Sequence, residues 1–190
     1  MGNNTVTVRI ATPEDAPRLA EIYAPYVLET AISFEYSAPD AREFCRRMER
    51  TLESFPYLVA EADGAIVGYA YAGPFIPRPA YDRCAEASIY VARGCHRRGV
   101  GRALYERLEQ FLRDMGILNL YACVGYPETE DEYLAFNSAR FHEHMGFKTV
   151  GMFRNCGYKF GRWYHMIWME KLLNPHSQSP APRKSFLELG

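Results

Sequence analysis

Apolar and polar positions repeat with two different periods near the start of the chain, and these periods predict one strand and two helices. Residues 5–10, T-V-T-V-R-I, alternate as a half-buried strand does. The segment T-P-E-D at residues 12–15 supplies a capping hydroxyl, a proline and two acids, so a helix is expected from there to about residue 29. A second helix is expected from residue 40 to about residue 54, because Phe44, Met48 and Leu52 recur on one face.

The central part of the chain predicts a β-hairpin followed by an irregular segment. Asp63-Gly64 separates the apolar runs 57–61 and 66–72, and Asp-Gly between such runs is the strongest short-range hairpin signal. Residues 73–82, G-P-F-I-P-R-P-A-Y-D, hold three prolines. Proline cannot donate to a strand ladder, so this segment is expected to be a shaped loop rather than a central strand.

Four further strands and two further helices complete the pattern. Strands are expected at residues 85–91, 117–124, 147–153 and 163–172, and helices at residues 100–115 and 137–145. The resulting order, β-α-α-β-β-β-α-β-α-β-β, is typical of a mixed α/β layer arrangement. It is too irregular for a doubly wound sheet.

Length and charge narrow the class of protein. The 190 residues suit one domain, expected over residues 1–173, and the Pro/Ser-rich residues 174–190 are expected to form a solvated tail in which S-F-L-E-L can still dock. The formal net charge of −1 gives no bulk attraction to nucleic acid or to an anionic membrane, so neither is expected as a partner. Every apolar run is shorter than the ~18 residues of a membrane helix, and the first residues lack a secretory signal pattern. A cytoplasmic protein is expected.

Cysteine and histidine spacing argues against metal chemistry. The five cysteines are odd in number, dispersed and free of any C-x-x-C pair, which disfavours a disulfide framework or a zinc knuckle. His142 and His144 stand two positions apart, so they point to different sides of a helix and cannot share a metal ion. No metal is expected.

The sharpest local motif is H-R-R-G-V-G-R-A at residues 96–103, between an expected strand and an amphipathic helix. Its glycines let the backbone approach a ligand, and the following helix start presents unpaired N–H groups and positive charge. A phosphate group fits such a site. The alternative is a charged turn that binds nothing. A dinucleotide fingerprint is excluded, because position 104 is Leu104 rather than glycine.

This motif resembles the acetyl-CoA signature of the GNAT acetyltransferase superfamily, a strand, then [Q/R]-x-x-G-x-G/A, then a helix. Other segments, in order, are similar to the phosphinothricin and methionine sulfoximine N-acetyltransferase branch: V-R-I-A-T-P-E-D, S-F-E at 33–35, L-V-A-E-A-D-G-A-I-V-G-Y-A-Y-A-G-P-F, A-Y-D-R-C-A-E-A-S-I-Y-V, S-A-R-F-H-E-H-M-G-F and G-Y-K-F-G-R-W-Y. The resemblance covers roughly residues 7–172. It implies a GNAT fold, with a mixed, mostly antiparallel sheet of about seven strands flanked by about four helices.

The resemblance also implies how acetyl-CoA would be held. The residues implied for the pyrophosphate are His96, Arg97, Arg98, Gly99, Val100, Gly101, Arg102 and Ala103, although His96 stands where the signature usually has Gln or Arg. Ile89, Tyr90 and Val91 would pair with the pantetheine arm, and the Tyr90–Val91 backbone would polarise the thioester carbonyl. Ser138 matches the branch as a CoA contact. Asn137 is either a second contact or a helix cap, because the usual Asn position holds Ala135.

Two residues match the catalytic positions of the branch. Glu86 falls at the position of the general base, which the chemistry requires because an alkylammonium cannot attack a thioester before it loses a proton. The alternative for Glu86 is an exposed strand residue. His142 stands where superfamily members often place the acid that protonates the leaving thiolate, and its alternative is a packed helix histidine.

The acceptor side is inferred from the proline-rich loop and from the branch. Arg78 is expected to clamp an anionic group of the substrate, with Phe34, Phe75, Tyr81 and Glu86 lining the pocket, and the alternative for Arg78 is a solvated charge. The segment K-F-G-R-W at 159–163 resembles a hairpin that reaches the neighbouring subunit, so a homodimer is expected.

Together these features predict an enzyme that moves the acetyl group of acetyl-CoA to a small amino acid or analogue by direct attack in a ternary complex. Two alternatives stay open. One is a protein or peptide N-acetyltransferase, and the other is an acetyl-CoA-binding domain without catalysis. The acidic loop at residues 128–132 has no explanation from sequence alone.

Overall fold

The computed structural model describes residues 6–189, and its helices and strands follow the order expected from the sequence. The elements are β1 (Thr7–Ile10), α1 (Ala16–Leu28), α2 (Ala41–Leu52), β2 (Tyr57–Ala62), β3 (Ala65–Pro74), β4 (Cys84–Val91), α3 (Val100–Asp114), β5 (Asn119–Tyr126), α4 (Asn137–His144), β6 (Lys148–Lys159) and β7 (Arg162–Leu172). Short 3-10 turns lie at η1 (Pro13–Asp15), η2 (Pro79–Tyr81) and η3 (Phe186–Leu189). Thr5, part of the first expected strand, lies outside the described residues.

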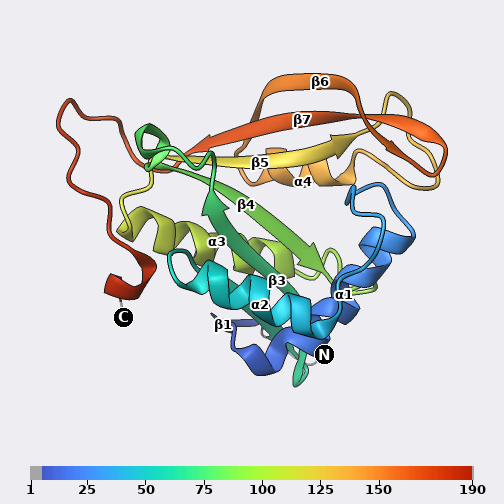
Figure 1. Ribbon diagram of the computed structural model, residues 1–190, viewed down its shortest axis with the longest axis horizontal. Helices are drawn as coiled ribbons and strands as arrows, with labels where there is room; N and C mark the ends of the chain where they lie inside the picture. Colours follow the sequence, from blue (N-terminus) through green and yellow to red (C-terminus); the bar gives the residue numbers. More distant parts are fainter. Residues whose placement is uncertain (1–5, 190) are drawn as a thin grey trace.

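The strands form one seven-stranded sheet with the order β1-β2-β3-β4-β5-β7-β6 (Figure 1). Only β4 and β5 are parallel, and every other neighbouring pair is antiparallel. The mixed, mostly antiparallel sheet of seven strands and the four flanking helices agree with the architecture expected from the sequence.

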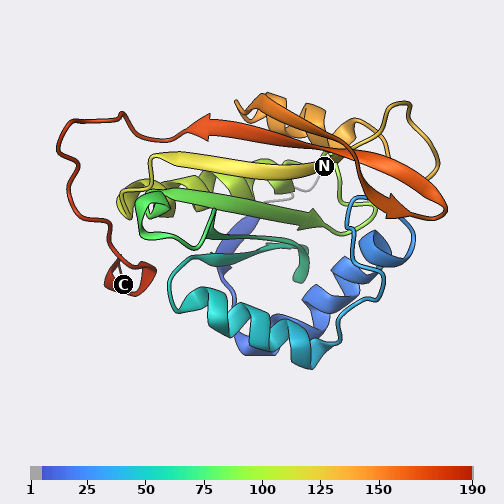
Figure 2. The ribbon, with the colours of Figure 1, turned by 45° about the horizontal axis from the view of Figure 1, so that its top comes forward.

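Helices lie on both faces of the sheet (Figure 2). Successive side chains of a strand point alternately toward these two layers. Tyr57, Val59 and Tyr69 pack against α1 and α2, whereas Leu58, Ala60, Ala70 and their neighbours pack against α3 and α4. The sheet is therefore covered on both faces, and Glu86 and Ser88 belong to the face that α1 and α2 cover, because they are in register with Gly73 and Tyr71.

Two tight turns close the hairpins. Asp63 and Gly64 have φ values of 54° and 77°, and Phe160 and Gly161 have 51° and 75°. Positive φ at both central residues is what a two-residue type I′ hairpin requires. The first turn was expected. The second closes a longer hairpin than expected, since β6 runs to Lys159 instead of ending near Phe153, with irregular pairing after Thr149 and Phe153.

The proline-rich segment departs slightly from the expected loop. Strand β3 continues to Pro74, which pairs with Ala85 at the very end of the β3–β4 ladder. The missing N–H of a proline at that position does not break the hydrogen bonds of the ladder before it. The segment after Pro74 is irregular apart from η2, as expected.

The C-terminal segment returns to the domain and docks at its end. Figure 1 shows it leaving β7 and turning back toward the ends of α2 and α3. The Lys184 N–H donates to the Met115 carbonyl at 2.9 Å, and the buried Phe186 ring meets Phe111 edge-on at 5.2 Å. The S-F-L-E-L segment is thus docked rather than solvated. Within residues 6–189, no helix has the length and apolarity to cross a membrane.

Candidate active site

The sheet opens between its two parallel strands. Pairing of β4 with β5 covers only residues 84–86 and 119–121, after which the strands diverge (Figure 1). On its other side, β4 stays paired with β3 as far as Val91. The edge of β4 that faces β5 is therefore unpaired from Ala87 onward, and an extended ligand can add to it as a strand would.

Alternation along β4 decides which backbone groups face this gap. The Ala92 N–H donates to the Val67 carbonyl of the β3 side at 2.8 Å. The N–H of Tyr90, two residues earlier, therefore also faces β3, while those of Ile89 and Val91 face the gap. The backbone of Val91 is already engaged on the side of the gap, because the Tyr26 hydroxyl donates to the Val91 carbonyl at 2.5 Å. The freely presented amide is thus that of Ile89, and the Tyr90 amide points away from the expected oxyanion position.

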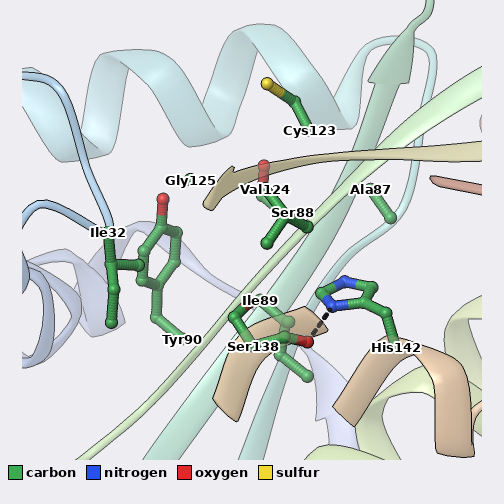
Figure 3. A pocket seen from close by; sticks show the side chains of 10 residues that line it. All are labelled: Ile32, Ala87, Ser88, Ile89, Tyr90, Cys123, Val124, Gly125, Ser138 and His142. Atoms are coloured by element: carbon green, nitrogen blue, oxygen red, sulfur yellow. Dashed lines mark hydrogen bonds between the residues drawn. The ribbon is translucent and has the colours of Figure 1, made fainter. Parts of the chain in front are cut away.

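A small cavity of about 50 Å³ lies in the gap (Figure 3). It brings together residues of β4, β5 and α4 with one residue of the loop after α1: Ile32, Ala87, Ser88, Ile89, Tyr90, Cys123, Val124, Gly125, Ser138 and His142. Four of the residues expected to act in donor binding or catalysis, Ile89, Tyr90, Ser138 and His142, therefore do meet at one place.

His142 is held by hydrogen bonds at both ring nitrogens. Its Nδ1 lies 2.8 Å from the Ser138 carbonyl, which can only accept, so Nδ1 carries a proton. Its Nε2 lies 2.8 Å from the Tyr105 hydroxyl and, when the ring is neutral, accepts a hydrogen bond from it. The residue is 4 % exposed, and burial lowers its pKa. A neutral imidazole carries one ring proton, and here that proton is donated to the Ser138 carbonyl, so the ring has none to give to a leaving group.

Glu86 differs from His142 because its side chain makes no hydrogen bond within the described part of the chain. The half-buried carboxylate makes no hydrogen bond or ion pair to any residue between 6 and 189. Burial raises its pKa above the ordinary value. It stands in register between Gly73 of β3 and Tyr121 of β5, at the last paired position before the gap opens. An unpaired carboxylate of raised pKa at this position is suited to accept a proton.

The turn before α3 leaves the helix start open. Gly99 is the cap residue with φ 81°, and the first internal bond runs from the Ala103 N–H to the Gly99 carbonyl. The N–H groups of residues 100–102 are consequently available to an anion. Gly101 has a packing reason as well, because a Cβ there would lie 3.0 Å from the Phe141 ring of α4.

The basic side chains of this turn differ in their ion pairs and hydrogen bonds. Arg98 pairs with Asp63 of the β2–β3 turn at 3.1 Å, whereas Arg97 has no ion pair within the described part of the chain. The Nε2 of His96 lies 3.1 Å from the Tyr26 hydroxyl. Since Tyr26 gives its proton to Val91, His96 must donate here, and Tyr26 links the turn to the edge of β4.

A larger cavity of about 660 Å³ lies between α2 and the same face of the sheet. Tyr57, Tyr69 and Tyr71 form part of its lining, and Gly73 and Pro74 lie at the end of β3. A Cβ on Gly73 would meet nothing within 4 Å, and Gly73 is in register with Glu86. The cavity therefore reaches the strand position beside the carboxylate.

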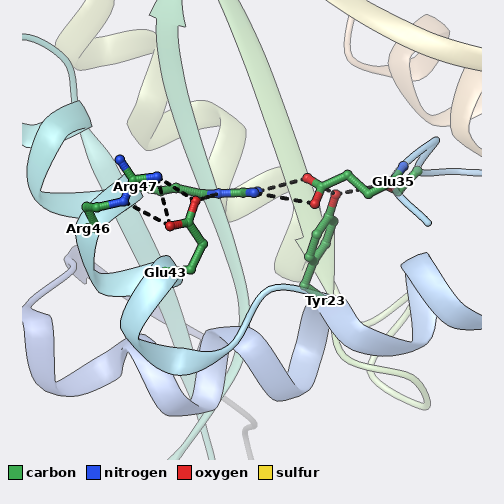
Figure 4. Close-up of polar contacts among 6 residues, drawn as sticks. Tyr23, Glu35, Glu43, Arg46 and Arg47 are labelled. Carbon is green, nitrogen blue, oxygen red and sulfur yellow. Dashed lines mark hydrogen bonds and ion pairs between the residues drawn. The ribbon is translucent and has the colours of Figure 1, made fainter. Parts of the chain in front are cut away.

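One end of this cavity carries a polar network (Figure 4). Arg47 donates to Glu35 at 2.8 Å and to Glu43 at 2.8 Å, and the Tyr23 hydroxyl donates to Glu35 at 3.1 Å. Tyr23 and Ser33 are also within 2.7 Å. This network fixes the loop between α1 and α2 beside the cavity.

The expected acceptor residues are only partly brought together. Phe75 stacks on Tyr121 at 4.2 Å and meets Tyr81 edge-on at 6.0 Å, so these two aromatic residues lie near the strand neighbour of Glu86. Phe34 packs instead against Gly157 of β6 and the cluster around Leu134. Arg78 is exposed and lines neither cavity.

Sequence reasoning missed Tyr26, Arg47, Cys123 and Arg183. None of them lies in a local motif, and only the fold carries Tyr26 to the edge of β4, Cys123 to the small cavity, and Arg47 and Arg183 to the larger one. Although Cys123 is exposed at the surface, desolvation by its neighbours, with Glu86 nearby, raises the pKa of its thiol to about 12, so this thiol is protonated and poorly suited to carry an acetyl group. No cluster of three metal-ligating His, Cys, Asp or Glu side chains occurs between residues 6 and 189.

Comparison with known proteins places the chain among acetyltransferases. Residues 8–168 match the family described as acetyltransferase (GNAT) domain. The phosphinothricin N-acetyltransferase of Alcaligenes faecalis is 37 % identical over 169 residues, 88 % of this chain and 83 % of the relative. The L-methionine sulfoximine/L-methionine sulfone acetyltransferase of Salmonella typhimurium is 30 % identical, over 93 % of this chain and 99 % of the relative. A GNAT phosphinothricin acetyltransferase from Sinorhizobium meliloti, solved in complex with acetyl-CoA, superimposes with a TM-score of 0.83 at 28 % identity, covering 96 % and 98 % of the two chains.

Proposed function

Because this chain belongs to the GNAT family of acetyltransferases, and is therefore an acyltransferase that uses acetyl-CoA, we propose that it acetylates the amine of a small amino acid or analogue. The observation that carries the proposal is the unpaired Glu86 carboxylate at the last β4–β5 pair before the gap, in register with Gly73 of the larger cavity. The substrates in the names of the relatives, phosphinothricin and methionine sulfone, are amino-acid analogues and support this acceptor class.

The donor fits the gap and the open helix start. The N–H groups at residues 100–102 and the unpaired Arg97 would hold the pyrophosphate, and the Ile89 carbonyl on the free edge of β4 would accept a hydrogen bond from the pantetheine arm. Ser138 lines the gap and would contact the donor there. Asn137 fits less well, because its side-chain oxygen accepts from the Ser138 N–H at 2.9 Å at the start of α4.

The transfer then needs two proton movements. Glu86, directly or through water, takes a proton from the acceptor ammonium, and the free amine attacks the thioester carbonyl. The C–N bond forms, the C–S bond breaks, and the second nitrogen proton passes to the CoA thiolate, while Glu86 releases its proton to solvent. The Ile89 amide would stabilise the oxyanion. We assign His142 a positioning role, because both of its nitrogens are engaged.

The proposed function is tested by thiol release from acetyl-CoA across a panel of amines. We expect transfer to methionine sulfone, methionine sulfoximine or phosphinothricin, with mass spectrometry showing the N-acetyl product. Transfer to peptides alone would support a peptide N-acetyltransferase. A protein that acetyl-CoA stabilises against heat but that acetylates no panel member would support a binding domain without catalysis.

We also propose that the enzyme is a homodimer formed through the β6–β7 hairpin. Six large apolar side chains of this hairpin are exposed, among them Trp163 at 62 %: Val150, Met152, Phe153, Tyr158, Trp163 and Leu172. Exposed apolar side chains gathered on one hairpin are typical of an interaction surface. Sedimentation is expected to give twice the mass of the chain, and Trp163→Glu to reduce it to one chain. A monomeric wild type would contradict the proposal.

A further inference from the structure

Resting on the proposed function, we propose that the docked C-terminal segment completes the acceptor cavity and that Arg183 binds an anionic group of the acceptor there. The cavity under α2 is lined by sheet residues, by α2 and by one residue of the C-terminal segment, Arg183. The acceptor class this predicts is an amine that carries a carboxylate or phosphinate.

The guanidinium of Arg183 is buried but poorly paired. Its side chain is only 12 % exposed, and its Nε has no hydrogen-bond partner within residues 6–189. The Asp82 carboxylate lies 3.6 Å away and is itself 59 % exposed, and the Ser54 carbonyl lies at the 3.5 Å limit of a hydrogen bond. Because buried cations in proteins are normally well paired, a guanidinium with long contacts in a cavity wall can accept a further anion.

The other arginines of the cavity are less available or less enclosed. Arg47 is bound by both Glu35 and Glu43, so its charge is already compensated. Arg50 is exposed on α2. Arg183 also lies over the Phe55 ring at 4.7 Å, a cation–π contact that helps to hold the guanidinium in the cavity wall.

Arg183 and the strand neighbour of Glu86 line the same cavity. Gly73, Pro74, Phe55 and Arg183 all line the cavity, and Gly73 is the strand neighbour of Glu86. An acceptor can therefore place its amine beside Glu86 and extend over the open face of Gly73, with its anion toward the C-terminal segment.

The segment that carries Arg183 is held on both sides of it. Arg83 donates to the Pro180 carbonyl at 3.3 Å before it, and Lys184 and Phe186 anchor it after it. The anchors lie on α3 and on the loops that flank the sheet, apart from the small cavity in the β4–β5 gap. Loss of Arg183 should thus change acceptor binding and leave donor binding intact.

The test compares acceptors that differ by one anion. Methionine sulfone is matched with 3-(methylsulfonyl)propylamine, which lacks only the carboxylate, and phosphinothricin adds a second anion. For Arg183→Gln we expect the KM of methionine sulfone, of phosphinothricin, or of both to rise about 10- to 100-fold, from the loss of a charge-assisted contact. The KM of the amine without carboxylate and the KM of acetyl-CoA should not change.

Two further variants keep the result interpretable. Arg183→Lys retains the charge and should recover part of the affinity, and Arg78→Gln removes an exposed arginine of the loop expected to bind substrate. Equal KM values for the wild type and Arg183→Gln on all three acceptors would overturn the inference, as would an effect on acetyl-CoA alone. A wild type that acetylates none of the three would instead overturn the proposed function.

Discussion

Replacing Glu86 by glutamine is expected to lower kcat/KM about 100- to 10,000-fold, the usual contribution of a positioned general base. Glutamine keeps the size of the side chain and cannot accept the proton of the acceptor ammonium. The carboxylate has no hydrogen bond or ion pair within the described residues to lose, so the fold and the donor site should be unaffected. Steady-state kinetics, together with the rise in Tm on addition of acetyl-CoA, measure both parts of this expectation.

The pH dependence separates a base from a merely structural carboxylate. Burial raises the pKa of Glu86, so wild-type activity should fall as pH drops through that raised pKa, and Glu86→Gln should lack this limb. A raised carboxyl pKa also means that the folded state loses stability as pH rises through it. At neutral pH the glutamine variant should therefore be at least as stable as the wild type. An unchanged pH profile would remove Glu86 from the mechanism.

His142 provides the contrasting variant. His142→Gln breaks the bonds to Tyr105 and Ser138 in a buried site, so its Tm should fall, while kcat/KM should fall less than about tenfold. A loss of activity comparable to that of Glu86→Gln, without loss of stability, would instead identify His142 as the acid.

Replacing Lys159 by methionine is expected to destabilise the protein by about 2–4 kcal/mol, roughly a 5–15 °C fall in Tm for a chain of this size. Lys159 is 3 % exposed, and its ammonium donates to the Val27 carbonyl at 2.7 Å and to the Ser33 carbonyl at 2.5 Å. Methionine fills the space and leaves both carbonyls unpaired. Burial lowers the pKa of this lysine, but the two carbonyls stabilise its charged form.

The matched control for Lys159 is Lys148→Met on the same strand. Lys148 is exposed, so its substitution should change Tm by about 1–2 °C at most. Because Val27 lies in the last turn of α1 and Ser33 lies in the loop that follows it, Lys159→Met should also increase proteolysis between residues 28 and 40. Equal melting curves for the two variants would contradict the role of Lys159 as an anchor.

Short sequence motifs correctly predicted the turns and helix starts whose backbone conformation depends on one or two residues. Asp63-Gly64 supplies the positive φ values of a tight turn, and the glycine at position 99 supplies the cap of α3. The extent of β6 was not predictable in this way, because most of its side chains are exposed on both faces and no alternation marks the strand. Tertiary pairing with β7 determines its length.

The acceptor site was harder to predict than the donor site for the same reason. The donor turn is contiguous in sequence, whereas the large cavity combines α2, three strands and a residue near the C-terminus. The role of the acidic loop at residues 128–132 was unpredictable for the same reason. Arg162 binds Asp131 at 2.9 Å and Glu132 at 2.8 Å, and Tyr133 stacks on Phe160 at 4.2 Å, so this loop holds the β6–β7 turn. Its partners lie about thirty positions away.

A cavity lined partly by a residue outside the sheet has an evolutionary consequence. The donor turn precedes α3, whose residues fill the core, so insertions there would disturb the packing of the whole sheet. Arg183 lies beyond β7 and outside the sheet, so it can be exchanged without shifting any strand register. Chains with this sheet can therefore diverge in the amine they accept through a segment outside the sheet, while the acetyl-transfer machinery stays the same.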